Sequence, residues 1–246
     1  MLQILGRLNR KEDHVRTILF AIGALAVAGI VAASPLAASG KWKVVKQSDG
    51  ITISTRPVEG SPVDEFRGVT TINARIEVIG EVLRDVPANV EWMADCKEAR
   101  VISRKDKDNL VIYFVQGAPG PVSNRDFIVR VNTTKNYDKG VVIVNLKAIA
   151  EPLVPVNPKY IRITDLTGQY ILQYIDRERT KVIYTVRANP GGSLPTWIAN
   201  YASKDTPFKT LAGLRRQSAK AKYVELGNNS EDKKKIEERL KKGGLK

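Results

Sequence analysis

Apolar and polar residues alternate along most of the chain from Lys41 onward, and this pattern predicts a β-rich domain. Successive side chains of a strand point to opposite faces, so period-2 alternation marks strands with one buried face. The pattern predicts strands over residues 51–56, 65–72, 100–104, 110–116, 126–134, 141–148, 160–165, 169–175 and 181–188. Most are separated by short polar turns, which favours antiparallel hairpins. Residues 151–159 hold three prolines and are therefore expected to form a loop.

Two stretches carry apolar residues at helical spacing instead. Residues 73–85 place Ile76, Ile79 and Val82 on one face, and a short helical segment with Trp92 follows over residues 89–94. Near the C-terminus, the turn sequence Asn-Pro-Gly-Gly at 189–192 precedes a longer amphipathic helix over residues 193–217. Pro207 interrupts that helix, so we expect the helix to be kinked or restarted there.

The order of these elements predicts the fold class. Strands come first, then a helical pair, a long antiparallel series of strands, and one long C-terminal helix. We therefore expect an α+β domain over residues 41–217, in which a curved antiparallel sheet grips the C-terminal helix.

The segments on either side of this domain have different compositions. Residues 1–38 carry basic residues and then an uncharged apolar run, as in a secretory signal peptide or an N-terminal membrane anchor. The small residues at 37–39 favour cleavage, and an uncleaved span is the alternative. Either reading exports the domain, to the periplasm or to the outer side of the inner membrane. Residues 218–246 form a charged, basic tail, and we expect a frayed charged helix or a disordered segment over its last part, residues 231–246.

Charge and residue usage narrow the range of functions. The 246-residue chain has a formal net charge of +14, which favours anionic partners. Its three tryptophans are too scattered for a base-stacking platform, so we expect an anionic membrane surface and no nucleic acid. His14 is the only histidine and lies in the leader, and Cys96 is the only cysteine. Histidine-based catalytic sites, multi-cysteine metal sites and disulfides are thereby excluded from the domain.

Several short motifs, taken in order, resemble the START domain, the steroidogenic acute regulatory protein-related lipid-transfer family. The likeness spans about residues 41–217. It rests on Asp49-Gly50-Ile51, on Glu65-Phe66-Arg67-Gly68, on Val82-Leu83-Arg84-Asp85 with Trp92, on Pro121-Val122-Ser123-Asn124-Arg125-Asp126-Phe127, and on Asn189-Pro190-Gly191-Gly192 with the helix start that follows. The resemblance implies a helix-grip fold with a hydrophobic tunnel for one lipid or sterol, which exchanges with membranes when the C-terminal helix opens. We expect a monomer without a cofactor.

The resemblance also assigns candidate site residues, whereas periodicity alone favours an ordinary packed core. The expected gate is formed by Gly191, Gly192 and Pro207. Val131 stands where family members that bury an acid–arginine pair place the arginine, which predicts a more apolar tunnel. The residues expected to line the tunnel are Trp92, Tyr113, Phe127, Val129, Val131, Val144, Leu146, Tyr170, Leu172, Tyr184, Val186, Trp197, Ile198, Tyr201 and Leu211.

Two other functions stay open on the sequence. The wider helix-grip superfamily includes polyketide cyclases and aromatases, and such an enzyme needs an ionisable group inside the cavity, for which Glu98 and Asp165 are candidates. An envelope-anchored module that senses a ligand without transferring it is the other alternative. The pair Arg125-Asp126 is more simply a structural ion pair or a set of turn hydrogen bonds than a catalytic pair. Cys96, with no histidine to activate it, is more simply a small core residue.

Overall fold

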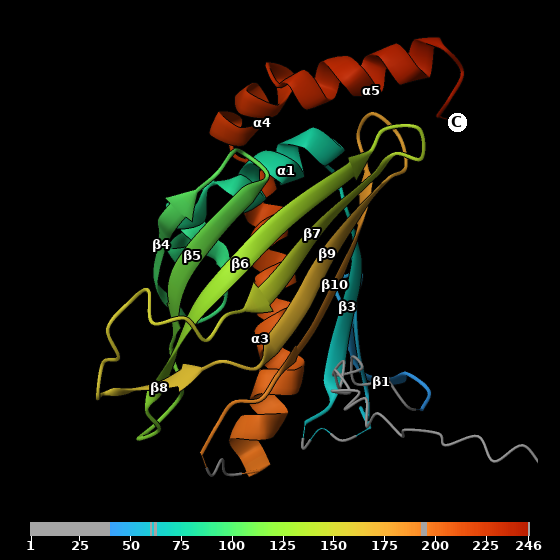
Figure 1. Cartoon of the computed structure of the whole chain (residues 1–246). Coiled ribbons are helices and arrows are strands. Elements are labelled where there is room, and N and C mark those ends of the chain that lie inside the picture. The colour runs from blue at the N-terminus through green and yellow to red at the C-terminus, as the bar shows by residue number, and fades with distance from the viewer. Residues whose placement is uncertain (1–39, 60, 62, 193–195, 246) are drawn as a thin grey trace, which may run out of the picture. The chain divides into compact units, whose positions relative to one another are not determined.

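The computed structural model (Figure 1) describes residues 40–59, 61, 63–192 and 196–245, so the leader expected over residues 1–38 lies outside the described residues. Within this part, ten strands form one sheet in the order β1-β2-β3-β10-β9-β7-β6-β5-β4, with β8 beside β6. The strands are β1 (Lys43–Ser48), β2 (Ile51–Arg56), β3 (Glu65–Ile72), β4 (Cys96–Arg104), β5 (Asn109–Gln116), β6 (Asn124–Asn136), β7 (Val141–Ala148), β8 (Tyr160–Ile163), β9 (Leu166–Tyr174) and β10 (Thr180–Ala188).

Neighbouring strands pair antiparallel along the whole path of the sheet, as the hairpin pattern predicts. The register places Tyr170 opposite Tyr184 and Val129 opposite Ile112. The expected fold class, a curved antiparallel sheet around a C-terminal helix, is confirmed. One pairing differs, because β8 runs parallel to the start of β6, from Asn124↔Tyr160 to Phe127↔Ile163. The proline-rich segment before β8 returns the chain to the start of β6.

Helices cover the concave face of the sheet (Figure 1). α1 (Ile76–Arg84), the 3-10 turn η1 (Val86–Ala88) and α2 (Asn89–Trp92) connect β3 to β4, and α3 (Thr196–Ser218) contacts β2, β3, α1 and α2. α3 is one uninterrupted helix through Pro207, so the expected restart is not observed. Residues 193–195 and the side chains of residues 196–200 lie outside the described part of the chain.

The C-terminal segment is folded: over residues 231–246, where we expect a frayed charged helix or a disordered tail, a charged helix forms, and its Ile236 is buried in the core. The segment forms α4 (Ala221–Asn228), which packs on α1, and α5 (Glu231–Lys241), whose first turn is capped by the Ser230 hydroxyl accepting from the Lys233 N–H at 3.1 Å. Tyr223 of α4 and Ile236 of α5 are buried in the main core. Each helix thus contributes one large apolar side chain to the domain, and α5 also buries the carboxylate of Asp232.

The core has two parts, one on each face of the sheet. The larger part lies on the concave face, where Val129, Leu172 and Val182 pack with Leu211 and Leu214 of α3. The smaller part lies on the opposite face of β5 and β6 and consists of Tyr113, Val115, Ile128, Ile149 and Val154. Of the helices in the described part of the chain, none has the length and hydrophobicity to cross a bilayer.

Candidate functional site

A cavity of about 190 Å3, here called the inner cavity, lies between the concave face of the sheet and the helices. Its wall comes from β5, β6, β7, β9 and β10 and from α1, α2 and α3. A mostly apolar wall with a few polar groups is typical of a small-molecule site. The apolar lining residues are Phe66, Leu83, Val86, Trp92, Met93, Leu110, Ile112, Phe114, Phe127, Val129, Val131, Val142, Val144, Leu146, Leu166, Tyr170, Tyr184, Val186 and Ala188.

A second cavity of about 410 Å3, here called the mouth cavity, adjoins the first and shares Phe66, Gln116 and Phe127 with it. It is lined by the segment before β3, the β5–β6 connection, Pro190, and α3 from Tyr201 to Thr206. Figure 1 shows the β5–β6 connection and the first turns of α3 at the same end of the sheet. The two cavities share wall residues, extend together from this end toward α1, and are together called the hollow.

Most of the residues expected along the tunnel lie on these walls. The inner cavity is lined by Trp92, Phe127, Val129, Val131, Val144, Leu146, Tyr170, Tyr184 and Val186, and Tyr201 lines the mouth cavity. The side chains of Trp197 and Ile198 lie outside the described residues.

Three expected lining residues lie elsewhere, and each has a physical reason. Tyr113 points to the opposite face of β5, where its hydroxyl donates to Asp126 Oδ2 at 3.1 Å. Leu211 packs against β2 and β3, so closely that a Cβ at Gly68 would be 2.5 Å from Leu211 Cδ1. Leu172 is fully buried where α1 covers β9, beyond the end of the cavity wall.

Polar groups on the inner wall were missed by the sequence analysis. α3 contributes Thr206 and Thr210, four residues apart and therefore on one helix face. The Thr210 hydroxyl accepts from the Ala94 N–H at 3.3 Å. These residues were missed because polar residues of an amphipathic helix are usually assigned to the solvent face. Their spacing of four residues was the available signal that they share a face.

Three buried polar atoms of wall residues make no hydrogen bond within the described part of the chain. They are Asn89 Oδ1, Trp92 Nε1 and the Tyr170 hydroxyl. Burial, and secondly the neighbouring Tyr184 hydroxyl, raises the pKa of Tyr170, so this residue stays neutral. Buried polar groups in folded proteins nearly always have a partner. These atoms are therefore free to bond a polar atom inside the cavity.

Polar contacts hold α3 over the mouth cavity. The Tyr201 hydroxyl donates to Asp95 Oδ2 at 2.8 Å and accepts from Lys209 Nζ at 3.0 Å. One turn further along the helix, Asp205 pairs with Lys46 of β1 at 2.6 Å. We call these contacts the α3 latch.

Two candidate gate residues precede α3. Gly191 and Gly192 have φ values of 61° and 63°, a region that favours glycine, and their backbone lies against Ile161 of β8. Pro207, the third candidate, is buried inside α3 and has no N–H for the preceding turn. The backbone thus has two positive-φ glycines directly before the described part of α3 and lacks one helical hydrogen-bond donor at Pro207.

Arg125 and Asp126 do not pair with each other, because neighbouring residues of a strand point to opposite faces. Asp126 accepts from Arg162 of β8, with Nε–Oδ1 and Nη2–Oδ2 distances of 3.0 and 2.8 Å. Arg125 lies on the wall of the mouth cavity and donates to the carbonyls of Pro190 and Ser123 at 3.2 and 2.6 Å. The expectation of a structural role holds for Asp126, with a different partner.

The residues considered for catalysis lie away from the cavities. Asp165 pairs with Arg187, Glu98 pairs with Arg100, and both carboxylates are about half exposed outside the cavity walls. Burial raises the pKa of the Cys96 thiol to about 11, so the reactive thiolate is scarce at neutral pH. In the described part of the chain, no three histidine, cysteine or acidic residues are grouped so as to hold a metal ion.

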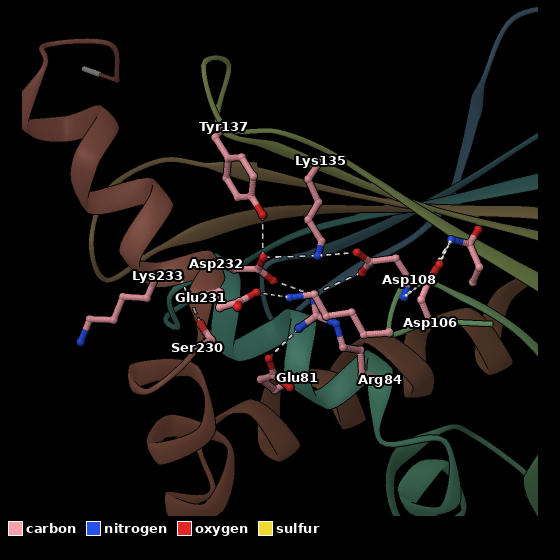
Figure 2. Close-up of polar contacts among 12 residues, drawn as sticks. Glu81, Arg84, Asp106, Asp108, Lys135, Tyr137, Ser230, Glu231, Asp232 and Lys233 are labelled. Carbon is pink, nitrogen blue, oxygen red and sulfur yellow. Dashed lines mark hydrogen bonds and ion pairs between the residues drawn. The ribbon is translucent and has the colours of Figure 1, made fainter. Parts of the chain in front are cut away.

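The end of the inner cavity away from the mouth is bordered by Arg84 and Lys107. Figure 2 shows Arg84 in a polar network with Asp232 of α5, next to Glu231. Arg84 Nη2 lies 2.6 Å from Asp232 Oδ2, and Lys107 Nζ lies 2.8 Å from Glu231 Oε2. Tyr137 donates to Asp232 at 2.6 Å. We call this the α5 network.

Comparison with known proteins places the chain in a family. The START domain family model matches residues 24–222. An uncharacterized protein of Pseudomonas aeruginosa is 37% identical over 180 residues, which are 73% of this chain and 87% of that protein. The phosphatidylcholine transfer protein of Mus musculus is 23% identical over 174 residues, or 70% of this chain and 80% of that protein.

A solved structure agrees with this placement. The STAR-related lipid transfer protein of Xanthomonas axonopodis, solved as a fragment, is 35% identical, and the match covers 73% of this chain and 99% of that one with a TM-score of 0.66. The family match covers the whole sheet and α1 to α3, which together build the hollow. The chain therefore belongs to the START domain family.

Proposed function

We propose that this protein binds one lipid in the inner and mouth cavities and carries it between membranes. The observation that carries the proposal is the hollow of largely apolar wall enclosed under α3 in a START domain. The mouse and Xanthomonas relatives are named as lipid transfer proteins, which supports the same activity here. Burial of apolar surface at about 25 cal/mol per Å2 would hold the lipid, and the wall replaces the acyl environment of the bilayer.

The α3 latch supplies a means of access. Release of Tyr201 from Asp95 and of Asp205 from Lys46 frees the first half of α3 from the rim of the mouth cavity. Gly191 and Gly192 before the helix, and Pro207 within it, allow that half to move while Leu211 and Leu214 stay packed in the core. The gate is thus the segment before and around Pro207.

The polar groups of the inner wall bear on the ligand. Leaving a buried polar group without a partner costs about 1–3 kcal/mol, so a ligand oxygen or hydroxyl that meets Asn89, Trp92 or Tyr170 is favoured over a plain hydrocarbon. We therefore propose a lipid that carries a hydroxyl or ester group near the middle of the hollow.

The surroundings in which the protein acts are part of the proposal. The basic and then apolar leader supports export, to the periplasm or the outer side of the inner membrane. The net charge of +14 supports contact with an anionic membrane surface. We propose that the protein works as a monomer. N-terminal sequencing of the exported protein and light scattering test these two points.

The proposal is tested by purifying the full chain, identifying co-extracted lipids by mass spectrometry, and measuring transfer of labelled lipid between vesicles. We expect one lipid per protein and measurable transfer. A protein that is empty and moves no lipid would overturn the proposal, whereas a bound lipid without transfer would indicate the sensing module.

The gate is tested with Tyr201→Phe, which removes the hydrogen bonds to Asp95 and Lys209. Each such bond contributes about 1 kcal/mol, so lipid exchange should become several-fold faster. The matched control is Lys222→Met. This change removes the ion pair between Lys222 of α4 and Asp85, which lies away from the mouth cavity. Equal exchange rates in wild type and Tyr201→Phe would contradict the gate.

A further inference from the structure

Arg125 is a buried cation without an acidic partner. It is 6% exposed, and its hydrogen bonds go to two backbone carbonyls, from Nε to Pro190 and from Nη1 to Ser123. Nη2 makes no hydrogen bond within the described part of the chain. Arg84, Arg162 and Arg187, by contrast, each reach a carboxylate at 2.6 to 2.8 Å. Buried charges normally have a partner of opposite sign, so Arg125 stands apart.

The carboxylates near Arg125 do not neutralise its charge either. Burial lowers the pKa of Arg125, and no carboxylate offsets it. The adjacent Asp126 is engaged on the opposite face by Arg162 and Tyr113. Asp64 also borders the mouth cavity, but it is exposed and forms no ion pair with Arg125. The positive charge of Arg125 is therefore uncompensated within the described part of the protein.

Arg125 lies where its positive charge can reach a bound ligand. It lies on the wall of the mouth cavity, next to Phe127 and Val186, which continue into the inner cavity. A ligand that enters the inner cavity with its hydrocarbon chain first would leave its head in the mouth cavity, where Arg125 lies on the wall. Guanidinium groups bind phosphate and carboxylate oxygens with short, charge-assisted hydrogen bonds.

We propose that Arg125 is the binding site for an anionic head group of the lipid, with the hydrocarbon chain directed into the inner cavity. The proposal rests on the lipid-carrier function and narrows it to lipids with a phosphate or carboxylate head. Asn89, Trp92 and Tyr170 then meet the ester or hydroxyl oxygens that lie one step further in.

Two lipids that differ only in the anion test the site. Palmitoyl lysophosphatidate and monopalmitoylglycerol share the chain and the glycerol, and only the first carries a phosphate. Both are titrated against the full-length protein, with tryptophan fluorescence as the readout and concentrations below aggregation of the lipid. A charge-assisted hydrogen bond predicts that lysophosphatidate binds about tenfold or more tightly. Equal affinities in the wild type would overturn the proposal without any variant.

Variants then assign the preference to Arg125. We expect the ratio of the lysophosphatidate affinity to the monopalmitoylglycerol affinity to fall toward one in Arg125→Gln and to be partly kept in Arg125→Lys. Thermal melting identifies variants that fold. A preference that persists in a folded Arg125→Gln protein would overturn the assignment.

Two further outcomes distinguish binding of a lipid head group from binding of free phosphate and from a failure to bind lipid. Displacement of lysophosphatidate by inorganic phosphate at equal concentration would assign the site to free phosphate and overturn the assignment to a lipid head group. Failure of both lipids to bind would overturn the lipid-carrier function, and this inference with it. Tight binding of both lipids with equal affinity leaves the carrier function intact and overturns only the role of Arg125.

Discussion

At the scale of single residues, one buried ion pair joins β6 to β8 on the convex face of the sheet. Asp126 is 1% exposed and accepts hydrogen bonds from Arg162 and from Tyr113. Arg162 also donates to the carbonyls of Val154 and Pro155. Burial, and then the Asp126 charge, raises the pKa of Tyr113 to about 12, so this hydroxyl remains a donor at any physiological pH.

Removing one partner of this pair should be costly. Asp126→Asn leaves the Arg162 charge buried without a counter-ion, and we expect the free energy of unfolding to fall by about 3 kcal/mol. Urea denaturation measures the change. The control is Glu98→Gln, whose ion pair with Arg100 has both side chains about half exposed, so we expect a loss of less than about 1 kcal/mol. Similar losses for the two variants would contradict this account.

The sequence predicts single side chains well where a charged neighbour determines the face of a strand. Arg130 and Asn132 have to face water, and this places Phe127, Val129 and Val131 on the cavity wall, where they lie. Tyr113 is misplaced because β5 is apolar on both faces, so alternation gives no direction. For Arg125 the sequence leaves an ion pair or turn hydrogen bonds open, and the structure has hydrogen bonds to the carbonyls of Ser123 and Pro190, which carry no side-chain signal.

At the scale of elements, the β7–β8 connection presents apolar side chains to solvent from a fixed backbone. Val154 is buried in the smaller core, whereas Leu153 and Val156 beside it are 50% and 64% exposed. Arg162 holds the carbonyls between them, and three prolines restrict the chain further. β8, which follows, lies against Gly191 and Gly192 at the mouth. If the protein exchanges lipid with membranes as proposed, we expect this loop to contact the bilayer.

We expect Leu153→Asp with Val156→Asp to weaken binding to vesicles of anionic phospholipid about tenfold or more, because two aliphatic side chains no longer enter the bilayer interface. Vesicle flotation measures the binding. The matched control is Val224→Asp with Leu226→Asp, two residues of α4 with similar exposure at the opposite end of the molecule. A larger effect of the control pair would locate the membrane contact at α4 instead.

Elements with a strong period are predictable, and elements held by distant contacts are not. The strands and α1 follow from alternation and helical spacing. α5 has Ile236 and Leu240 as its only apolar residues within 11 positions, so its pattern is typical of a solvated tail. Its docking depends on Arg84, Lys107 and Tyr137, which are remote in sequence. The parallel pairing of β8 likewise depends on where a long loop returns the chain.

At the scale of the whole molecule, the α5 network connects the C-terminus to the far end of the hollow (Figure 2). Burial alone would raise the pKa of Asp232, but the Tyr137 hydroxyl, Arg84 and Lys135 outweigh it and lower the pKa to about 2 from the usual 3.8. The folded state therefore favours the ionised carboxylate. This stabilisation is complete above about pH 5 and is lost as the pH falls toward 2.

The shift corresponds to about 2 kcal/mol of stability, present at neutral pH and absent at pH 2. We expect Asp232→Asn to be less stable than the wild type at pH 7 and to lose less stability on acidification. Urea denaturation at a series of pH values from 7 to 3 measures both. Parallel pH profiles for the two proteins would show that Asp232 does not couple the C-terminus to the fold.

The family match ends at residue 222, before α5 begins. The closed end of the hollow is nevertheless bordered by Arg84 and Lys107, whose acidic partners Asp232 and Glu231 belong to α5. If the proposed carrier function holds, the reach of a hydrocarbon chain at this end depends on Arg84 and Lys107. We therefore expect truncation before α5, which removes their acidic partners, to change the acyl chain length that the protein accepts.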